Sequence, residues 1–178
     1  MFVGAETVLD VTFDVARMRL ANLARTGWLA GASGDAYGEW GQGLARVGPL
    51  GSAPGVSRLV EVRLRDVVMH ESSAVLALRW EAVGPGGGLF PVLDADIKLT
   101  PHGESETLMA MTGAYRPPLG AVGAALDRAV MHRVAVASVQ SFVSRVGTAI
   151  ADPAGATAPQ AASGTPRWLR FPLAPEEA

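Results

Sequence analysis

The sequence predicts an α+β fold in which an antiparallel sheet packs against one long C-terminal helix. Two observations support this. Several segments between residues 57 and 115 alternate apolar and polar side chains and are separated by short turns that contain Gly or Pro. Residues 120–151 instead carry apolar side chains at intervals of three and four. Strands joined by such short turns pair antiparallel, and a helix of this length extends about 45 Å, enough to cross a whole sheet.

The N-terminal part predicts a strand and a short helix. Residues 6–15 alternate and are typical of a half-buried strand. Asp14 can then cap the amphipathic helix that follows, and Gly27 can close it. Residues 28–56 are rich in glycine, and we expect a single strand there, at residues 37–47.

The remaining strands are clearer, because in most of them one face is apolar and the other is charged. Val62, Leu78 and Ile97 belong to the apolar faces, whereas Arg63, Arg79 and Asp96 belong to the charged ones. The predicted strands span residues 57–67, 74–83, 91–99 and 106–115.

The composition excludes several classes of function. The formal net charge is −2 and the basic residues are scattered, which argues against nucleic acid or an anionic membrane as the main partner. There is no cysteine, so disulfides, thiolate nucleophiles and Cys-ligated zinc are excluded. The N-terminus has no secretory pattern, and no apolar run reaches the roughly 20 residues of a membrane helix. We expect a soluble, cytoplasmic protein without integral membrane insertion.

The composition changes again at residue 152. Residues 152–178 are rich in Ala, Pro, Gly, Ser and Thr, which is typical of a linker or tail. The segment from Trp168 to Phe171 is too apolar for a pure spacer. We therefore expect one domain over residues 1–151 and a tail that is either flexible or docked through this segment.

The order of these elements resembles the helix-grip fold of the SRPBCC superfamily, also called START-like. The resemblance covers about residues 5–151 and rests on that order and on four stretches, "LRWEA", "GGLFP", "GAYRPPLG" and "LDRAVMHRVA". It implies a curved sheet that grips the C-terminal helix and leaves a cavity between them. It also implies binding of lipids, sterols, polyketides or other apolar molecules. A minority of members are cyclases, dehydratases or hydrolases.

His132 is the one ionisable side chain on the apolar stripe of the predicted helix, so we expect it to face the sheet. It could act as a general acid/base or bind a ligand. It could equally be a core histidine with a satisfied hydrogen bond. Other large apolar side chains suit either an adaptable pocket or an ordinary core. The candidate ligand-binding residues are Trp80, Phe90, Met109, Met111, Tyr115, His132 and Val136.

Other polar patterns have simpler interpretations. Asp94 and Asp96 project from one face of a strand, and we expect that face to be solvated and to hold cross-strand ion pairs. Arg116 could bind a carboxylate at the cavity mouth or pair with an acid such as Asp127. The glycines at 120 and 123 lack the parallel-strand context of a dinucleotide site. The histidines lack metal-ligand spacing, so we expect no metal and no cofactor.

Three functions remain open at this point. The first is binding of an apolar or amphipathic small molecule in a cavity between sheet and helix. The second is a polyketide cyclase or dehydratase activity with His132 as the acid/base. The third is a structural or interaction module whose cavity is filled by its own side chains. The back of the helix also has few charges, with Val134 and Phe142 on it, which predicts that the tail or a second subunit of a homodimer covers it.

Overall fold

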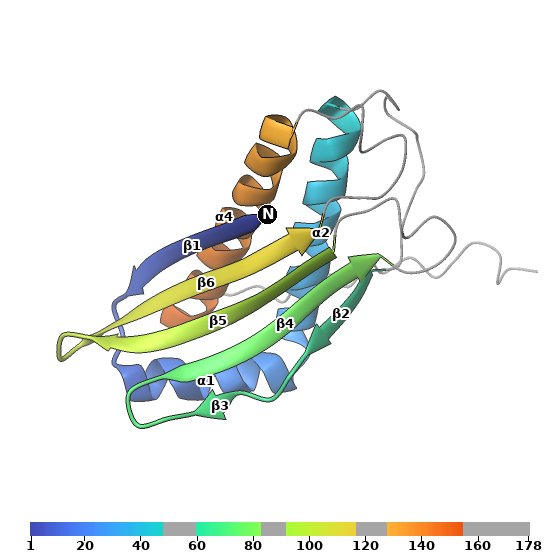
Figure 1. Ribbon diagram of the computed structural model, residues 1–178. Helices are drawn as coiled ribbons and strands as arrows, with labels where there is room; N and C mark the ends of the chain where they lie inside the picture. Colours follow the sequence, from blue (N-terminus) through green and yellow to red (C-terminus); the bar gives the residue numbers. More distant parts are fainter. Residues whose placement is uncertain (48–59, 83–91, 117–127, 155–178) are drawn as a thin grey trace, which may run out of the picture.

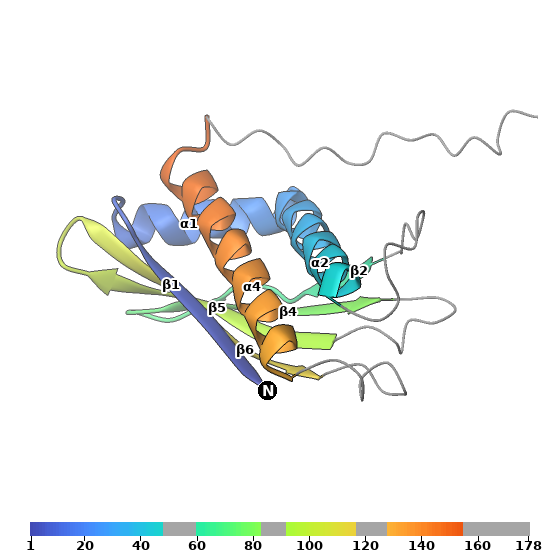
Figure 2. The ribbon, with the colours of Figure 1, turned by 90° about the horizontal axis from the view of Figure 1, so that it is seen from above.

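The computed structural model describes residues 1–47, 60–82, 92–116 and 128–154. The fold is α+β, with a curved antiparallel sheet on one side and the described helices on the other (Figures 1 and 2). The described strands are β1 (Phe2–Leu9), β2 (Val60–Leu64), β3 (Val68–Met69), β4 (Ala74–Ala82), β5 (Val92–His102) and β6 (Glu106–Arg116). The described helices are α1 (Phe13–Arg25), α2 (Trp28–Val47) and α4 (Arg128–Ala151).

The sheet has the order β1-β6-β5-β4-β2, and β3 pairs with β4. Every pairing is antiparallel, as the short predicted turns require. The hairpin between β5 and β6 turns at Gly103, whose φ of 73° is a left-handed value that favours glycine. The four predicted strands between residues 57 and 115 are confirmed, and β5 continues three residues further than predicted, to His102.

The first strand ends earlier than predicted. β1 stops at Leu9 and α1 begins at Phe13, so Asp14 lies in the first helical turn and is not the N-cap. Thr12 holds the N-cap position. Thr107 of β6 donates a hydrogen bond of 2.8 Å to the carbonyl oxygen of Val11, which fixes the link between strand and helix. The predicted helix end is confirmed, because Gly27 takes a left-handed φ of 77° directly after the cap.

The predicted strand at residues 37–47 is wrong, because this segment belongs to helix α2. Glycines at this density disfavour both helices and strands, so local propensity gave no reliable guide. Tertiary packing decides the structure instead. The buried side chains recur at helical spacing, at Leu29, Ala32, Ser33, Ala36 and Tyr37.

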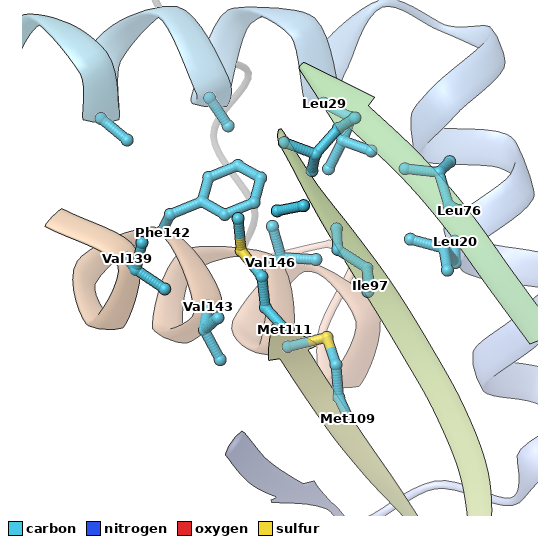
Figure 3. Packing of buried hydrophobic residues seen from close by; sticks show 14 of the residues in the cluster. Leu20, Leu29, Leu76, Ile97, Met109, Met111, Val139, Phe142, Val143 and Val146 are labelled. Carbon is cyan, nitrogen blue, oxygen red and sulfur yellow. The ribbon is translucent and has the colours of Figure 1, made fainter. Parts of the chain in front are cut away.

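Helix α4 crosses the sheet and packs beside α2 (Figure 2). It is described from Arg128, whereas the prediction began at Gly120, which lies outside the described residues. The segment His132–Ala151 is long and apolar enough to span a membrane by length and composition, but half of it is buried inside the protein. It is therefore the core helix of this domain. Its fully buried side chains include Ala135, Val139, Phe142, Val146 and Ile150 (Figure 3).

Gly147 lets α4 approach β1 closely. A Cβ atom at this position would lie 3.2 Å from Leu9 Cδ2 and 3.3 Å from Thr7 Cγ2. Both distances are shorter than an ordinary van der Waals contact. The missing side chain therefore sets the distance between helix and sheet at this crossing.

Candidate functional site

The interior between the sheet and the helices centres on Trp80 of β4, which is fully buried. Its ring packs edge-on against Phe142 of α4, with centroids 5.0 Å apart and an interplanar angle of 89°. It also packs edge-on against Tyr37 of α2, with centroids 6.5 Å apart. Edge-to-face geometry is favourable for aromatic pairs. Trp80 is therefore the point where the sheet, α2 and α4 meet.

Three buried side-chain polar atoms make no hydrogen bond to any described residue: Trp28 Nε1, Ser33 Oγ and Trp80 Nε1. Ser33 and Trp80 belong to the interior between the sheet and α2, whereas Trp28 lies at the start of α2. Ser33 lies one helical turn before Tyr37, on the same buried face of α2. A buried donor without a partner costs about 1–3 kcal/mol. The interior therefore offers two hydrogen-bonding groups that the described part of the chain does not use.

The predicted ligand-binding residues differ in their burial. Trp80, Met109 and Met111 are buried on the inner face of the sheet, and Met109 and Met111 lie below α4 (Figure 3). Val136 of α4 is half-buried at the edge of the same core. Phe90 lies outside the described residues. Whether the described members bind a ligand stays a prediction.

His132 lies over the sheet, as predicted, but the expectation that it belongs to the buried face is wrong, because its side chain is exposed. Its position around the helix was predicted well, since Val139, Val143 and Val146 on the same stripe are buried. Its position along the helix explains the difference. His132 lies near the described start of α4, over Tyr115 at the end of β6, where the sheet stops.

Tyr115 is the buried member of this pair. The rings of Tyr115 and His132 stack, with centroids 6.4 Å apart and an interplanar angle of 19°. The phenol of Tyr115 donates a hydrogen bond of 2.9 Å to Met1 Sδ. Burial raises the pKa of the Tyr115 phenol above its ordinary value. This buried phenol under an exposed imidazole lies at the end of β6, apart from the aromatic cluster around Trp80.

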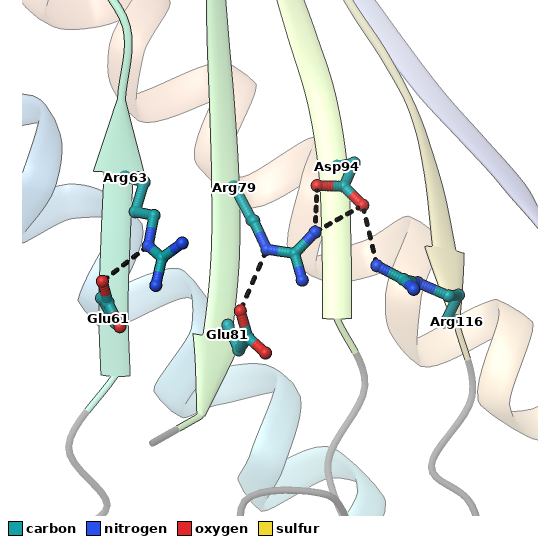
Figure 4. A network of polar contacts seen from close by, with 6 residues as sticks. All are labelled: Glu61, Arg63, Arg79, Glu81, Asp94 and Arg116. Carbon is teal, nitrogen blue, oxygen red and sulfur yellow. Dashed lines mark hydrogen bonds and ion pairs between the residues drawn. The ribbon is translucent and has the colours of Figure 1, made fainter.

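Asp94 belongs to an ion-pair network on the outer face of the sheet (Figure 4). Arg79 Nη1 donates to both carboxylate oxygens of Asp94, at 2.8 and 3.0 Å, and Arg79 Nε donates to Glu81 at 3.0 Å. Arg116 reaches Asp94 at 3.4 Å, a pairing that was not predicted. Its predicted partner, Asp127, lies outside the described residues. Glu81 and then Asp94 raise the pKa of the Arg79 guanidinium. Asp94 and Asp96 are both exposed on this face, as predicted.

Two surface hollows are lined by described residues. One has a volume of about 640 Å³ and lies on the outer face of the sheet, over Ala77, Asp94 and Gly113. The other has about 490 Å³ and runs between β1 and α4, from Glu6–Asp10 to Gln140–Ala151. Neither is lined by Trp80, Met109 or Met111. The cavity predicted between sheet and helix thus stays a prediction.

Metal ligation has no support in the described part of the chain, where no three His, Asp or Glu side chains are grouped to hold an ion. His70 and His102 are exposed, as the turn positions predict. Gly120 and Gly123, which were discounted as a dinucleotide site, lie outside the described residues.

Sequence reasoning missed the contribution of α2 and the role of Phe142. Ser33 and Tyr37 were assigned to no site, because residues 28–47 were not recognised as helical. The spacing of Leu29, Ser33 and Tyr37, four residues apart, was a usable signal. Phe142 was placed on the back of α4, whereas it is fully buried against Trp80.

Comparisons with known proteins find similarity in fold only. No protein-family model and no curated protein matches the sequence. A conserved protein from Geobacillus kaustophilus is similar in structure, with 15% identity and a TM-score of 0.45 over 83% of this chain and 93% of that one. The ZhuI aromatase/cyclase from Streptomyces sp. R1128 has 12% identity and a TM-score of 0.37 over 87% of this chain and 98% of that one.

Norcoclaurine synthase from Thalictrum flavum, in complex with dopamine and hydroxybenzaldehyde, has 10% identity and a TM-score of 0.36 over 82% of this chain and 85% of that one. Likeness at this level says nothing about a ligand or an activity. The topology of the chain itself is the stronger evidence. Its curved antiparallel sheet, helices after the first strand and long last helix across the inner face make this an SRPBCC-like helix-grip fold.

Proposed function

We propose that the protein binds an apolar or amphipathic small molecule between the sheet and the helices, beside Trp80. The observation that carries the proposal is the buried Nε1–H of Trp80, which has no hydrogen-bond partner among the described residues. Proteins rarely leave such a donor unused, because its desolvation is not compensated. A ligand oxygen that accepts this hydrogen bond would recover the lost free energy.

The surroundings of Trp80 indicate the chemistry of the ligand. Tyr37 and Phe142 present aromatic rings to Trp80, and Met109 and Met111 lie on the same inner face of the sheet. Methionine side chains are unbranched and adapt their rotamers to an incoming apolar group. Ser33 Oγ adds a second group that can donate or accept. The ligand is therefore an aromatic or alkyl molecule that carries a carbonyl or hydroxyl oxygen.

Native mass spectrometry of the purified full-length protein tests for a co-purified ligand directly. In parallel, titration with a dansylated long-chain fatty acid measures binding by its fluorescence. Trp80→Phe keeps an aromatic ring and removes the N–H, so we expect affinity to fall by about twofold to tenfold, the value of one hydrogen bond. Trp28→Phe is the matched comparison, because Trp28 Nε1 is also buried without a hydrogen-bond partner among the described residues but lies at the start of α2, outside the proposed site. We expect no change in affinity there, and equal losses in the two variants would contradict a site beside Trp80.

Two further results would contradict the proposal. One is the absence of both a co-purified molecule and probe binding. The other is equal probe affinity for the wild type and for Trp80→Phe. His132→Leu distinguishes the interior from the open end of the sheet: because His132 is exposed, we expect this variant to bind the probe like the wild type.

A further inference from the structure

Strand β1 lies at one end of the sheet and, within the described strands, pairs only with β6. Met1 and Tyr115 exchange two backbone hydrogen bonds, of 2.8 and 2.9 Å, at the start of this unbroken register. In an antiparallel ladder such bonds alternate along the strand. The odd-numbered residues of β1 therefore bond to β6. The even-numbered residues direct their N–H and C=O groups at the free edge; they are Phe2, Gly4, Glu6 and Val8.

This edge lacks the usual protection against pairing. β1 contains no Pro and no Lys, and its register with β6 has no bulge. It exposes apolar side chains instead, since Phe2 is 83% exposed and Val8 is 47% exposed. The strand at the opposite end of the sheet differs. β2 has five residues and carries the charged pair Glu61 and Arg63.

One self-pairing register suits β1. If Ala5 lies opposite Ala5 of a second copy, Phe2 lies opposite Val8 and Gly4 lies opposite Glu6. The two most exposed apolar side chains of the strand then cover each other on the outer face, and no like charges are opposed. A shift of the register by two residues in one direction would place Glu6 opposite Glu6. The same shift in the other direction would place Phe2 opposite Glu6, so that the exposed apolar side chains no longer cover each other. A shift by one residue would place the inner face of one copy beside the outer face of the other.

Beside this edge, helix α4 presents a surface that a second copy of the chain can cover. The groove of about 490 Å³ between β1 and α4 is bordered on the helix by Gln140, Ser144 and Thr148, which are exposed and uncharged. In the register centred on Ala5, Gly4 of the second copy lies opposite Glu6, at one end of this groove. The second copy would thus cover the groove without burying a charged side chain of α4.

We propose that two copies of this chain pair through β1, antiparallel and centred on Ala5, to form one continuous sheet with both helix layers on the same side. A two-fold axis perpendicular to the sheet, midway between Ala5 and its copy, relates the two chains. The proposal does not depend on the ligand site around Trp80.

The natural absence of cysteine allows a direct test of the register in the full chain. Ala5 and its copy form a non-hydrogen-bonded pair, whose Cα atoms lie about 4.5 Å apart, within the range of a disulfide. Ala5→Cys is therefore expected to give a covalent dimer under mild oxidation. Thr7→Cys is the matched control. It faces Val3 of the second copy rather than itself, so it should crosslink far less.

Substitutions that introduce charges at Phe2 and Val8 test the same contact without crosslinking. In the proposed register, Phe2→Lys combined with Val8→Lys opposes like charges at both ends of the interface and should give monomers. Phe2→Lys combined with Val8→Glu opposes unlike charges and should restore the dimer. The two positions lie about 20 Å apart within one strand, so they cannot interact inside one copy. Sedimentation velocity over a concentration series measures the monomer and dimer populations.

Three outcomes would overturn the proposal. The wild type could stay monomeric at every concentration. It could dimerise while both double variants and both cysteine variants behave alike, which would place the interface elsewhere. Finally, a monomeric wild type that dimerises when Trp168 and Phe171 are both replaced with Ala would show that the C-terminal tail covers this edge. Circular dichroism of each variant confirms that it is folded.

Discussion

Arg19 of α1 caps the end of α4. Its Nη1 donates hydrogen bonds of 2.6 Å to the carbonyl oxygen of Ile150 and 3.0 Å to that of Ala151. The last carbonyl groups of a helix have no partner within the helix and carry partial negative charge. One arginine therefore satisfies two of them and links the first helix of the chain to the last.

Removal of this cap should destabilise the fold measurably. We expect Arg19→Gln to lower the free energy of unfolding by about 1–2 kcal/mol, since two carbonyl oxygens lose a charged donor. Urea denaturation followed by circular dichroism measures the change. Arg25→Gln is the control, because Arg25 is exposed in the last turn of α1 and should cost less than about 0.5 kcal/mol. Equal losses in the two variants would contradict the capping role.

Gly147 should tolerate no branched side chain. Gly147→Val must displace Leu9 or Thr7, so we expect a loss of about 1–3 kcal/mol in the free energy of unfolding. Gly38 of α2 offers the contrast, because a Cβ there meets no atom within 4 Å. Gly38→Ala should raise the free energy of unfolding by about 0.5–1 kcal/mol through helix propensity. Thermal denaturation of both variants tests the difference in sign.

Tyr115 should make the fold sensitive to high pH. Burial raises the pKa of its phenol in the folded state above the ordinary value near 10. The unfolded chain then loses the proton first. The stability from this group is therefore complete below about pH 10 and is lost as the pH rises through the folded-state pKa. Tyr115→Phe should flatten this alkaline loss, as measured by urea denaturation at a series of pH values. An unchanged pH profile would contradict the assignment.

Asp94 should matter little for stability and only at low salt. Its pair with Arg79 is partly exposed, with side-chain exposures of 30% for Arg79 and 48% for Asp94. Exposed pairs contribute about 0.2–1 kcal/mol and are screened by salt. We expect Asp94→Asn to cost this amount in low salt and less in high salt. Asp96→Asn, on the same strand and face but without an ion pair to a described residue, should show no salt dependence. A loss of several kcal/mol at Asp94 would indicate another role.

The strands could be predicted because alternation is a strong signal. Leu93, Ala95, Ile97 and Leu99 are buried, and the residues between them are exposed. In α2 the corresponding signal was weak, because its glycines lower the propensity for any regular structure. The burial of Leu29 and Tyr37 against the sheet and α4 decides that this segment is a helix.

The candidate site could be predicted only in part. Trp80 belongs to a strand with a clear apolar face, so its inward direction followed from the sequence. Helix α4 is apolar on several sides, so its sequence did not show that Phe142 packs on Trp80. For His132 the apolar spacing predicted the direction around the helix. It could not show that the sheet ends beneath that turn, because the position along a helix at which a sheet stops depends on distant residues.

Local patterns were enough to predict the strands between residues 57 and 115, the long last helix and the charged outer face. Each of these depends on a spacing of two, or of three to four, residues within one segment. The tertiary structure alone decided which segments meet: Ser33 and Tyr37 with Trp80, Arg19 with the end of α4, and Gly147 with β1. Contacts between distant segments depend on packing geometry, which no local pattern records.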